Sequence, residues 1–196
     1  MSKRAAEVYR ETSESEVKVK LNLDGKGEST INTPIPFLNH LLTLFTAHSL
    51  CDLNIDATGD MEVDDHHTVE DIGICLGQVL KNAVGDKKGI KRYGEATIPM
   101  DESLVRVVLD LSGRAYLAYN LEFKRDVIGN LATENIREFF QALVNNAGMN
   151  LHIDLIRGEN SHHIAEATFK ALARALKTAV SYEAGVTDVW STKGKL

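Results

Sequence analysis

The sequence predicts an α+β protein made of two fused repeat half-domains, each a mainly antiparallel sheet with helices on one face. Three observations lead to this prediction. The order of apolar patterns in the first half of the chain recurs in the second half. Each half contains alternating apolar and polar residues, which indicate half-buried strands. Each half closes with a helical apolar stripe that begins at a His-His-x-x-Glu motif.

The early strand of each half ends in a turn dipeptide. Residues 17–25 read VKVKLNLDG and end in Asp-Gly, whereas residues 105–113 read VRVVLDLSG and end in Ser-Gly. This pattern is typical of a strand that enters a hairpin. We therefore expect returning strands near 27–33 and 114–123.

The later elements repeat as well. Segments with helical apolar spacing at 36–50 and 135–149 are followed by predicted strands at 51–60 and 150–159. A helix then begins at each histidine pair, with Asp65 and Ser161 as the expected N-caps. Each half thus reads strand, strand, helix, strand, helix. Residues 85–100 form the predicted connection, and the half-domains are expected at 1–88 and 89–196. They should pack on each other, because one helical layer would leave apolar surface exposed.

Composition narrows the class of protein. The chain has 196 residues, 43% of them hydrophobic, and a formal net charge of -6. Such a chain is a poor candidate for general binding to nucleic acid or to an anionic membrane. No apolar run is long enough to span a bilayer, and the start, MSKRAAEVYRETSESE, lacks the apolar core of a signal peptide. Cys51 and Cys75 lie in apolar segments and indicate reduced core thiols, so we expect a cytoplasmic protein.

The two histidine pairs are the strongest functional signal. Residues 64–71 read DDHHTVED, and residues 160–167 read NSHHIAEA. Helical residues three or four apart share a face, so Glu70 is reachable from both His66 and His67. The two imidazoles are turned about 100° apart around the helix axis, so each more naturally serves a different metal ion. A single histidine at a helix start is usually a cap or a surface residue, but two copies at equivalent repeat positions favour metal binding.

The upstream helices add one candidate ligand to each motif. His40 and Glu138 occupy equivalent positions before the two motifs, once a shorter loop in the second half is allowed for. A set of imidazoles and carboxylates suits Mn, Fe or Zn, and no thiolate is present to favour Zn. The helix starts of one chain need not face each other, so the pattern also allows a site that forms only across a subunit interface. The eight candidate ligands are His40, His66, His67, Glu70, Glu138, His162, His163 and Glu166.

Six segments also carry a family resemblance. They are PFLNHLL (36–42), DATGDMEVDDHHTVEDI (56–72), DLSGRAYLAYNLEF (110–123), EFFQALVNNAGMNLHI (138–153), NSHHIAEATFKALARAL (160–176) and STKG (191–194). Through them the chain resembles the imidazoleglycerol-phosphate dehydratase family of histidine biosynthesis over nearly its whole length. The resemblance implies half-domains of the ribosomal S5 domain 2-like type and dehydration of imidazole-glycerol phosphate to imidazole-acetol phosphate. It also implies two Mn(II) ions per active site and a cubic homo-oligomer of about 24 subunits with active sites at subunit interfaces.

The same resemblance divides the ligands between the two ions. One ion would be held by His40, His67, His162 and Glu166. The other would be held by His66, Glu70, Glu138 and His163, with Glu138 standing where relatives carry histidine. The reaction needs metal because no carbonyl acidifies the proton that is lost. A metal on a ring nitrogen can lower the pKa of the ring N–H and favour an imidazolate, which can expel the hydroxyl.

Position matching implies the remaining site residues. Glu14, Glu70 and Glu166 are the implied catalytic residues, although Glu14 alone is typical of a solvated glutamate before an edge strand. Arg92, Arg114, Lys170 and the tail would bind the phosphate. The implied substrate-binding residues are Glu14, His40, His48, His66, Glu70, Arg92, Arg114, His162, Lys170, Ser191, Thr192 and Lys193.

Three other classes of protein compete with this interpretation. A dinuclear hydrolase of a phosphate ester would use a metal-activated water in place of a substrate ring nitrogen. A metal-storage scaffold would line a four-helix bundle with Glu and His, which the strand signals at 17–23 and 105–111 disfavour. An RNA-binding module is suggested by the half-domain type, but the acidic net charge argues against it and fold analogy is a weak warrant.

Overall fold

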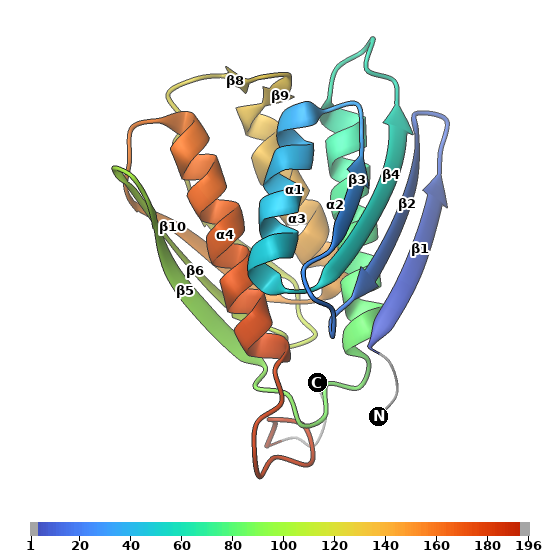
Figure 1. The fold of residues 1–196 in the computed structure, drawn as a ribbon, viewed down its shortest axis with the longest axis vertical. Helices are drawn as coiled ribbons and strands as arrows, with labels where there is room; N and C mark the ends of the chain where they lie inside the picture. Colours follow the sequence, from blue (N-terminus) through green and yellow to red (C-terminus); the bar gives the residue numbers. More distant parts are fainter. Residues whose placement is uncertain (1–3, 193–196) are drawn as a thin grey trace.

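The computed structural model describes residues 4–192, in which a layer of four helices lies between two four-stranded sheets (Figure 1). The first half contains β1 (Ala5–Glu11), β2 (Ser15–Asn22), β3 (Ser29–Asn32), α1 (Pro36–Ser49), β4 (Asp52–Gly59) and α2 (His66–Val84). The second half contains β5 (Tyr93–Met100), β6 (Ser103–Asp110), β7 (Tyr116–Asn120), β8 (Val127–Ile128), β9 (Leu131–Ala132), α3 (Thr133–Ala147), β10 (Asn150–Arg157) and α4 (Ser161–Val180). Apart from the small β8–β9 hairpin, the two halves repeat one order, which confirms the predicted α+β fold of two repeats.

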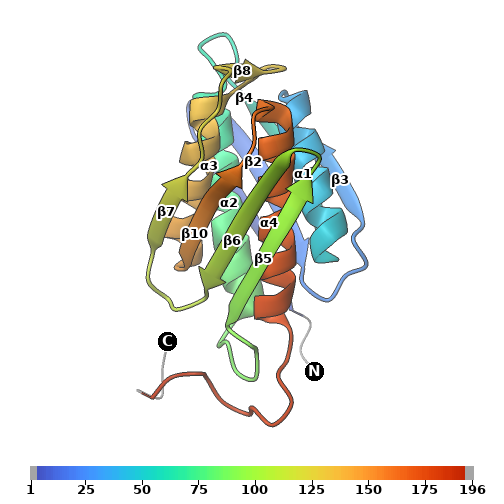
Figure 2. The same ribbon diagram turned by 90° about the vertical axis from the view of Figure 1, so that its left-hand side faces the viewer.

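The central strands show why the sheets pack against the helices. In β2, Val17, Val19 and Leu21 are buried, whereas the residues between them are exposed. β6 alternates in the same way, with Val105 and Val107 fully buried. This period of two gives each sheet one apolar face toward the helices and one polar face outward. Figure 2 shows the second sheet from its outer side, with β5, β6, β10 and β7 in that order.

The predicted pairing of the early strands is wrong. The sheet orders are β1-β2-β4-β3 and β5-β6-β10-β7, so β4 separates β2 from β3 and β10 separates β6 from β7. β3 and β4 are parallel neighbours joined through α1, and such a crossover needs a helix rather than a tight turn. The Asp-Gly and Ser-Gly turns therefore lead the chain away from β2 and β6 without forming hairpins.

The edge strands β1 and β5 were not predicted from the sequence, and neither was the short β8–β9 pair. β1 pairs with β2 along its whole length, and β5 occupies the second half of the segment 85–100, which was expected to be only a connection. Both are edge strands, and most of their residues are exposed or half-buried. They therefore lack the continuous buried apolar row that identifies β2 and β6. In the two four-stranded sheets the hairpins are β1–β2 and β5–β6.

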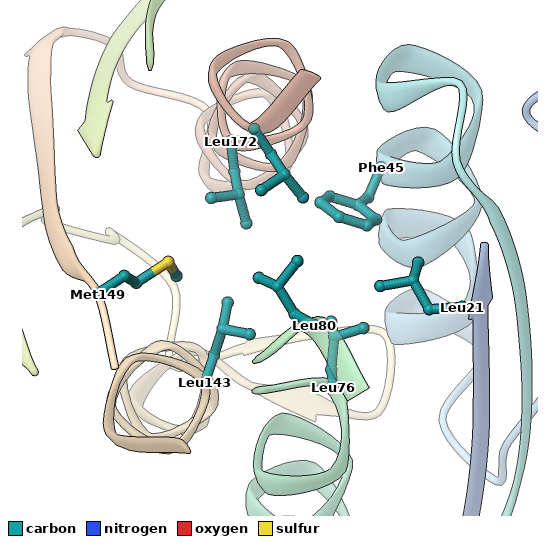
Figure 3. Close-up of a pocket in the computed structure, with 8 residues that line it drawn as sticks. Leu21, Phe45, Leu76, Leu80, Leu143, Met149 and Leu172 are labelled. Carbon is teal, nitrogen blue, oxygen red and sulfur yellow. The ribbon is translucent and has the colours of Figure 1, made fainter. Parts of the chain in front are cut away.

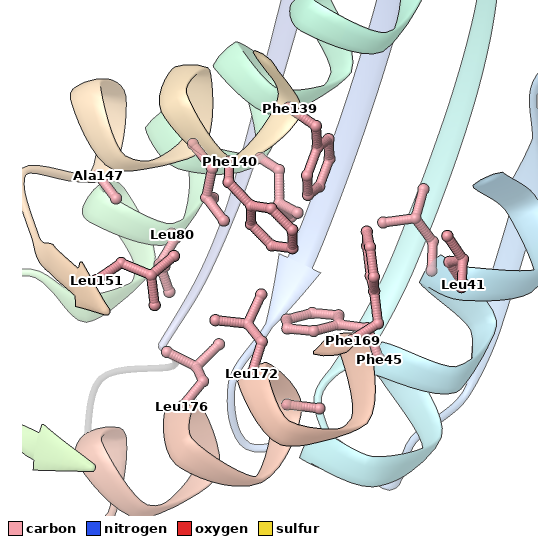
Figure 4. Close-up of a cluster of buried hydrophobic side chains, with 14 of the residues drawn as sticks. Leu41, Phe45, Leu80, Phe139, Phe140, Ala147, Leu151, Phe169, Leu172 and Leu176 are labelled. Carbon is pink, nitrogen blue, oxygen red and sulfur yellow. The ribbon is translucent and has the colours of Figure 1, made fainter. Parts of the chain in front are cut away.

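The helix layer pairs helices from different halves. α1 packs against α4, and α2 packs against α3. Gly73 and Gly77 permit the second contact, because a Cβ at either position would lie 2.6 Å from a carbonyl oxygen of α3. Phe139, Phe140 and Phe169 join the pairs at the centre, with ring centroids 5.3 to 5.5 Å apart (Figure 4). None of the helices within residues 4–192 has the length and apolar character needed to cross a membrane.

All four helices begin at the same end of the layer, the upper end in Figure 1. Both histidine motifs therefore lie at one end of the molecule, since each opens a helix. The positive ends of the four helix dipoles also point there. The connections that follow the helices lie at the opposite end.

A small cavity inside the core is not a substrate site. Its volume is about 10 Å³, and apolar side chains alone line it, among them Phe45 of α1, Leu80 of α2 and Leu143 of α3 (Figure 3). A space of this size holds about one water molecule, and it offers no polar group to orient a polar ligand.

The two cysteines are buried free thiols, as expected from the sequence. Burial raises the pKa of both thiols, that of Cys75 to about 11. Because the thiolate is the reactive form, we expect iodoacetamide to modify both slowly in the native protein and rapidly in urea. Mass spectrometry of timed samples would measure this, and rapid modification of the native protein would contradict the buried placement.

Candidate metal centre

Three predicted ligands converge where α1 meets α4. His40 Nε2 lies 2.8 Å from Glu166 Oε1, and His162 Nε2 lies 2.9 Å from the same oxygen. The three ligand atoms all lie within 4.8 Å of one another. Across residues 4–192, no other group of three His, Cys, Asp or Glu side chains meets this criterion. We call His40, His162 and Glu166 the α1–α4 half-site.

Glu166 is the electrostatic centre of this half-site. Its side chain is only 8% exposed, whereas those of His40 and His162 are each 45% exposed. Burial opposes ionisation of Glu166, but hydrogen bonds from Lys170, His40 and His162 outweigh it and lower its pKa to about 2. Lys170 Nζ donates to Glu166 Oε2 at 2.6 Å. Glu166 is therefore a carboxylate at neutral pH. Two imidazole nitrogens and a carboxylate oxygen form a donor set that fits a divalent metal such as Mn, Fe or Zn.

Adjacent histidines point in different directions, as the helix geometry predicts. The ring planes of His66 and His67 are 86° apart, and those of His162 and His163 are 88° apart. His66 Nδ1 lies 3.0 Å from Asn135 Oδ1 on α3, so this ring is directed toward the α2–α3 contact. His67 Nδ1 lies 3.0 Å from a carboxylate oxygen of Asp60, just beyond β4. The two rings of a pair thus serve different surroundings.

A second set of candidates occupies the α2–α3 pair. His66 and Glu70 lie one turn apart on α2, and Glu138 lies one turn beyond Asn135 on α3. We call His66, Glu70 and Glu138 the α2–α3 half-site, because it repeats the arrangement of the first with the two halves of the chain exchanged. Its ligand atoms lie farther apart than those of the α1–α4 half-site. Glu138 Oε1 instead lies 3.6 Å from the guanidinium nitrogen Nη1 of Arg137. Neither set includes His67 or His163, so the grouping of all eight ligands stays a prediction.

The helix caps differ from those predicted. Asp64 Oδ1 accepts the backbone N–H of His66, and Asn160 Oδ1 accepts that of His162. Asp65 occupies the N-cap position, but its side chain makes no capping bond and binds α3 instead. Ser161 is already the first residue of α4. In each motif the capping side chain therefore lies one residue before the predicted one.

Glu14 and His48 flank the ligands at different places. Glu14 lies in the exposed β1–β2 turn, with Oε1 3.8 Å from His67 Nε2. His48 lies in the last turn of α1, where burial, and then the charges of Lys170 and Arg174 on α4, lower its pKa. Glu14 is therefore near a predicted ligand, whereas His48 is a largely neutral imidazole beside α4.

The predicted phosphate-binding residues lie mostly at the other end of the helices. Arg92 donates its backbone N–H to Ala179 near the end of α4, and its guanidinium binds Asp110 at 2.6 and 2.9 Å and the carbonyl of Trp190. Arg114 follows β6, and its carbonyl accepts a bond from Asn150, just after α3. Ser191 and Thr192 follow Trp190, and Lys193 lies outside the described residues. Lys170 differs from them, because it stands beside Glu166, a metal-ligand candidate of its own chain.

Sequence reasoning missed three side chains that contact the histidines. Asp60 and Asn135 bind His67 and His66, and Glu102 binds His163 at 2.7 Å between its Oε2 and the ring Nδ1. Asp60 could have been suspected, because it directly follows a strand and lies just before the first motif. Glu102 gave no signal, because it lies in a hairpin whose first strand was not predicted.

Comparison with known proteins gives consistent matches. Residues 33–176 match the sequence profile described as imidazoleglycerol-phosphate dehydratase. The chain is 65% identical over 190 residues to the imidazoleglycerol-phosphate dehydratase of Syntrophomonas wolfei. This alignment covers 97% of this chain and 96% of that protein. It is 54% identical over 193 residues to that of Geobacter sulfurreducens, with 98% and 99% covered.

Solved structures agree in fold as well as in sequence. The crystal structure of imidazoleglycerol-phosphate dehydratase from Staphylococcus aureus superposes with a TM-score of 0.83 at 47% identity, covering 91% of this chain and 99% of that one. The enzyme from Pyrococcus furiosus, solved in complex with (S)-C348, gives a TM-score of 0.84 at 35% identity, covering 96% and 100%. These matches extend over both halves of the chain.

Proposed function

The chain belongs to the imidazoleglycerol-phosphate dehydratase family, and from this premise we propose that it dehydrates D-erythro-imidazole-glycerol phosphate at a dinuclear metal centre shared between subunits. Its activity is that of a hydro-lyase of histidine biosynthesis. The single observation that carries the metal-dependent proposal is the convergence of His40 and His162 on the buried carboxylate Glu166. The donor set fits Mn(II), and we propose two Mn(II) ions per site.

The reaction removes a hydroxyl from the carbon attached to the imidazole ring and a proton from the next carbon, which together leave as water. The product enol then becomes the ketone, imidazole-acetol phosphate. Two metal ions held by the eight predicted ligands would supply Lewis-acid polarisation that favours the imidazolate form of the substrate ring.

Each half-site needs one further imidazole to complete a set of four ligands. We assign His67 of the partner subunit to the α1–α4 half-site, and the partner subunit's His163 to the α2–α3 half-site. Support comes from the tandem histidines themselves. Within one chain, His162 contacts Glu166 and His66 contacts Asn135 on α3. The neighbouring rings have other partners, since His67 binds Asp60 and His163 binds Glu102.

The protein's own side chains would orient the substrate and move the proton. Glu14 is exposed on the β1–β2 turn beside His67, where it can take or return a proton of the substrate carbon chain. Glu70 and Glu166 are the carboxylate ligands at the imidazole-bearing end, and the lowered pKa of Glu166 keeps it ionised. Lys170 lies one helical turn beyond Glu166 and donates to its carboxylate, so its ammonium group stands beside the half-site, where it would also meet substrate oxygens. His48 lies two turns beyond His40, close enough to Lys170 to sense its charge.

The phosphate would be held by residues from the far end of another subunit. Arg92, Arg114, Ser191, Thr192 and Lys193 carry cations and donors suited to a phosphate. Because Arg92 and Arg114 lie near the ends of α4 and α3, they reach the metal ligands only in an assembly. We therefore propose a cytoplasmic homo-oligomer, about 24 subunits in size, in which helix starts of one subunit meet helix ends of others.

Turnover by metal-stripped protein tests the function directly. Imidazole-glycerol phosphate should be left unchanged until Mn(II) is added, after which imidazole-acetol phosphate should form. Size-exclusion chromatography of both samples should show the large particle with Mn(II). Binding of Mn(II) and assembly without turnover would reject the dehydratase and favour a hydrolase or a non-catalytic metal scaffold.

The C-terminal tail gives a separate prediction. Deleting residues 191–196 should raise the KM for substrate at least about tenfold, because a charge-assisted contact to phosphate is worth about 1.5–3 kcal/mol. The melting temperature should change little, since Ser191 and Thr192, the described residues of the deleted segment, are not buried. Steady-state kinetics with thermal unfolding would measure both. An unchanged KM would show that the tail does not bind the phosphate.

A further inference from the structure

The β1–β2 and β5–β6 hairpins carry equivalent carboxylates with different surroundings. Ser15 begins β2 and Ser103 begins β6, so Glu14 and Glu102, the residues just before them, occupy equivalent turns of the repeat. Glu14 is exposed and lies 3.8 Å from the nearest histidine nitrogen. Glu102 instead holds His163, with 2.7 Å between its Oε2 and the ring Nδ1. The two copies of the hairpin have diverged in what their carboxylate does.

The second oxygen of Glu102 fixes the carboxylate in place. Oε1 accepts the backbone N–H of Asn160 at 2.8 Å and that of Glu159 at 3.3 Å, both in the loop that leads into α4. It also accepts the hydroxyl of Ser103 at 3.0 Å. Glu102 thus binds the loop before His163 with one oxygen and the ring of His163 with the other.

A carboxylate at Nδ1 determines which nitrogen can bind a metal. Because an ionised carboxylate only accepts hydrogen bonds, the Nδ1 of His163 must be the N–H donor. In the neutral ring, Nε2 then carries the lone pair and faces away from Glu102. Orientation of a ligating histidine through its other nitrogen is a general feature of metal sites.

Two more of the predicted ligands follow the same rule. Asp60 accepts from Nδ1 of His67 at 3.0 Å. Asn135 presents its Oδ1 to Nδ1 of His66, and its amide is oriented by donation to Asp65 at 3.0 Å. Since Asp60 holds Nδ1 of His67 in the first half, the hairpin carboxylate Glu14 is not needed for that task; it stays exposed, 3.8 Å from Nε2 of the same ring.

We propose that Glu102 is a positioning residue of the metal centre, which holds His163 so that its Nε2 is presented to a divalent ion. This rests on the proposed function in taking His163 as a ligand. The competing role for Glu102 is a purely structural brace between the β5–β6 hairpin and the start of α4.

The glutamine variant separates the two roles, because an amide offers one acceptor and one donor. Glu102→Gln can keep its oxygen on the backbone N–H groups of the loop, but it then turns an N–H toward Nδ1. The ring must accept there, so Nε2 carries the proton and cannot bind metal. Glu102→Ala removes both contacts and leaves the ring free to adopt either tautomer. A positioning role therefore makes Gln no better than Ala, whereas a brace makes Gln clearly better.

The test is Mn(II) binding to the metal-stripped protein, with free Mn(II) quantified by electron paramagnetic resonance. Wild-type protein should bind two ions per chain. In Glu102→Gln, one ion should bind about 10–100-fold more weakly and the other as before. Glu159→Gln is the matched control: it removes a charge from the same loop, is exposed, and contacts Lys124 rather than an imidazole, so both ions should bind normally. Normal binding of both ions to Glu102→Gln, or clear recovery in Gln relative to Ala, would overturn the proposal.

A measurement on wild-type protein covers the case in which the variants do not fold. Histidine-labelled, metal-stripped protein at alkaline pH should show His163 as the Nδ1–H tautomer in nitrogen NMR, and an Nε2–H tautomer would reject the proposal. Neither experiment needs catalysis. A wild-type protein that binds two ions but does not dehydrate the substrate would reject the proposed function and leave the role of Glu102 intact.

Discussion

Replacing His66 or His163 with alanine should remove one manganese ion and abolish dehydration. Both residues belong to the proposed four-ligand set that also contains Glu70 and Glu138, and a missing imidazole leaves that ion with three ligands. Loss of an outer partner of a metal ligand costs about 10–100-fold, so loss of the ligand should exceed about 100-fold in kcat/KM. The double variant should be hardly worse than either single variant, because the two residues act on the same ion.

The chain provides a matched control for these variants. His152 is an exposed histidine on β10 whose ring lies 5.7 Å from that of Tyr116, away from every predicted ligand. His152→Ala should keep full metal content and activity. Metal analysis by mass spectrometry together with steady-state rates would decide the matter. Stoichiometric manganese retained in either His66→Ala or His163→Ala would refute the ligand set.

Mixing two inactive variants should restore activity if the site is shared between subunits. His40→Ala damages the α1–α4 half-site, and Glu70→Gln damages the α2–α3 half-site. In a shared site, an intact α1–α4 half-site from one variant can meet an intact α2–α3 half-site from the other. Random co-assembly from equal amounts should give about one quarter of wild-type activity, because each half-site is intact in half of the subunits.

The experiment requires metal-stripped variants that are mixed first and assembled with Mn(II) afterwards. His40→Ala mixed with Glu166→Gln is the control, since both damage the same half-site and no combination of them is complete. Recovery in the first mixture alone supports a shared site. No recovery in either mixture, with particles of normal size, would mean that each site is built within one chain.

The sequence predicted those features that depend on local periodicity. Both histidine motifs open helices as expected, because the apolar stripes of α2 and α4 have helical spacing and polar side chains cap their first turns. The buried strands β2 and β6 were equally visible, since alternation over a full strand is a strong signal. His40 could be placed with its partners only through the repeat, and the structure brings it to 2.8 Å from Glu166.

The features that the sequence did not predict depend on contacts between segments far apart in the chain. The strand order was predicted wrongly because an alternating pattern identifies a strand but not the strand that pairs with it. β4 lies between β2 and β3 in the sheet, although it follows α1 in the chain. β5 was missed because it is an edge strand with few buried residues. Glu102 was missed with it, since its contact to His163 spans 61 residues and leaves no short-range pattern.

The exchange of helices between the halves has a consequence for how such a chain could have arisen. Each half-site takes one helix from each half, since α1 meets α4 and α2 meets α3. A free-standing half would therefore own no complete half-site, and it could rebuild one only by pairing with a second copy of itself. In such a symmetric pair the two half-sites would be identical. Joining the copies in one chain removed the need for the two half-sites to be identical. His40 on one side can therefore be matched by Glu138 on the other. In the same way, Glu14 can stay exposed while Glu102 binds His163.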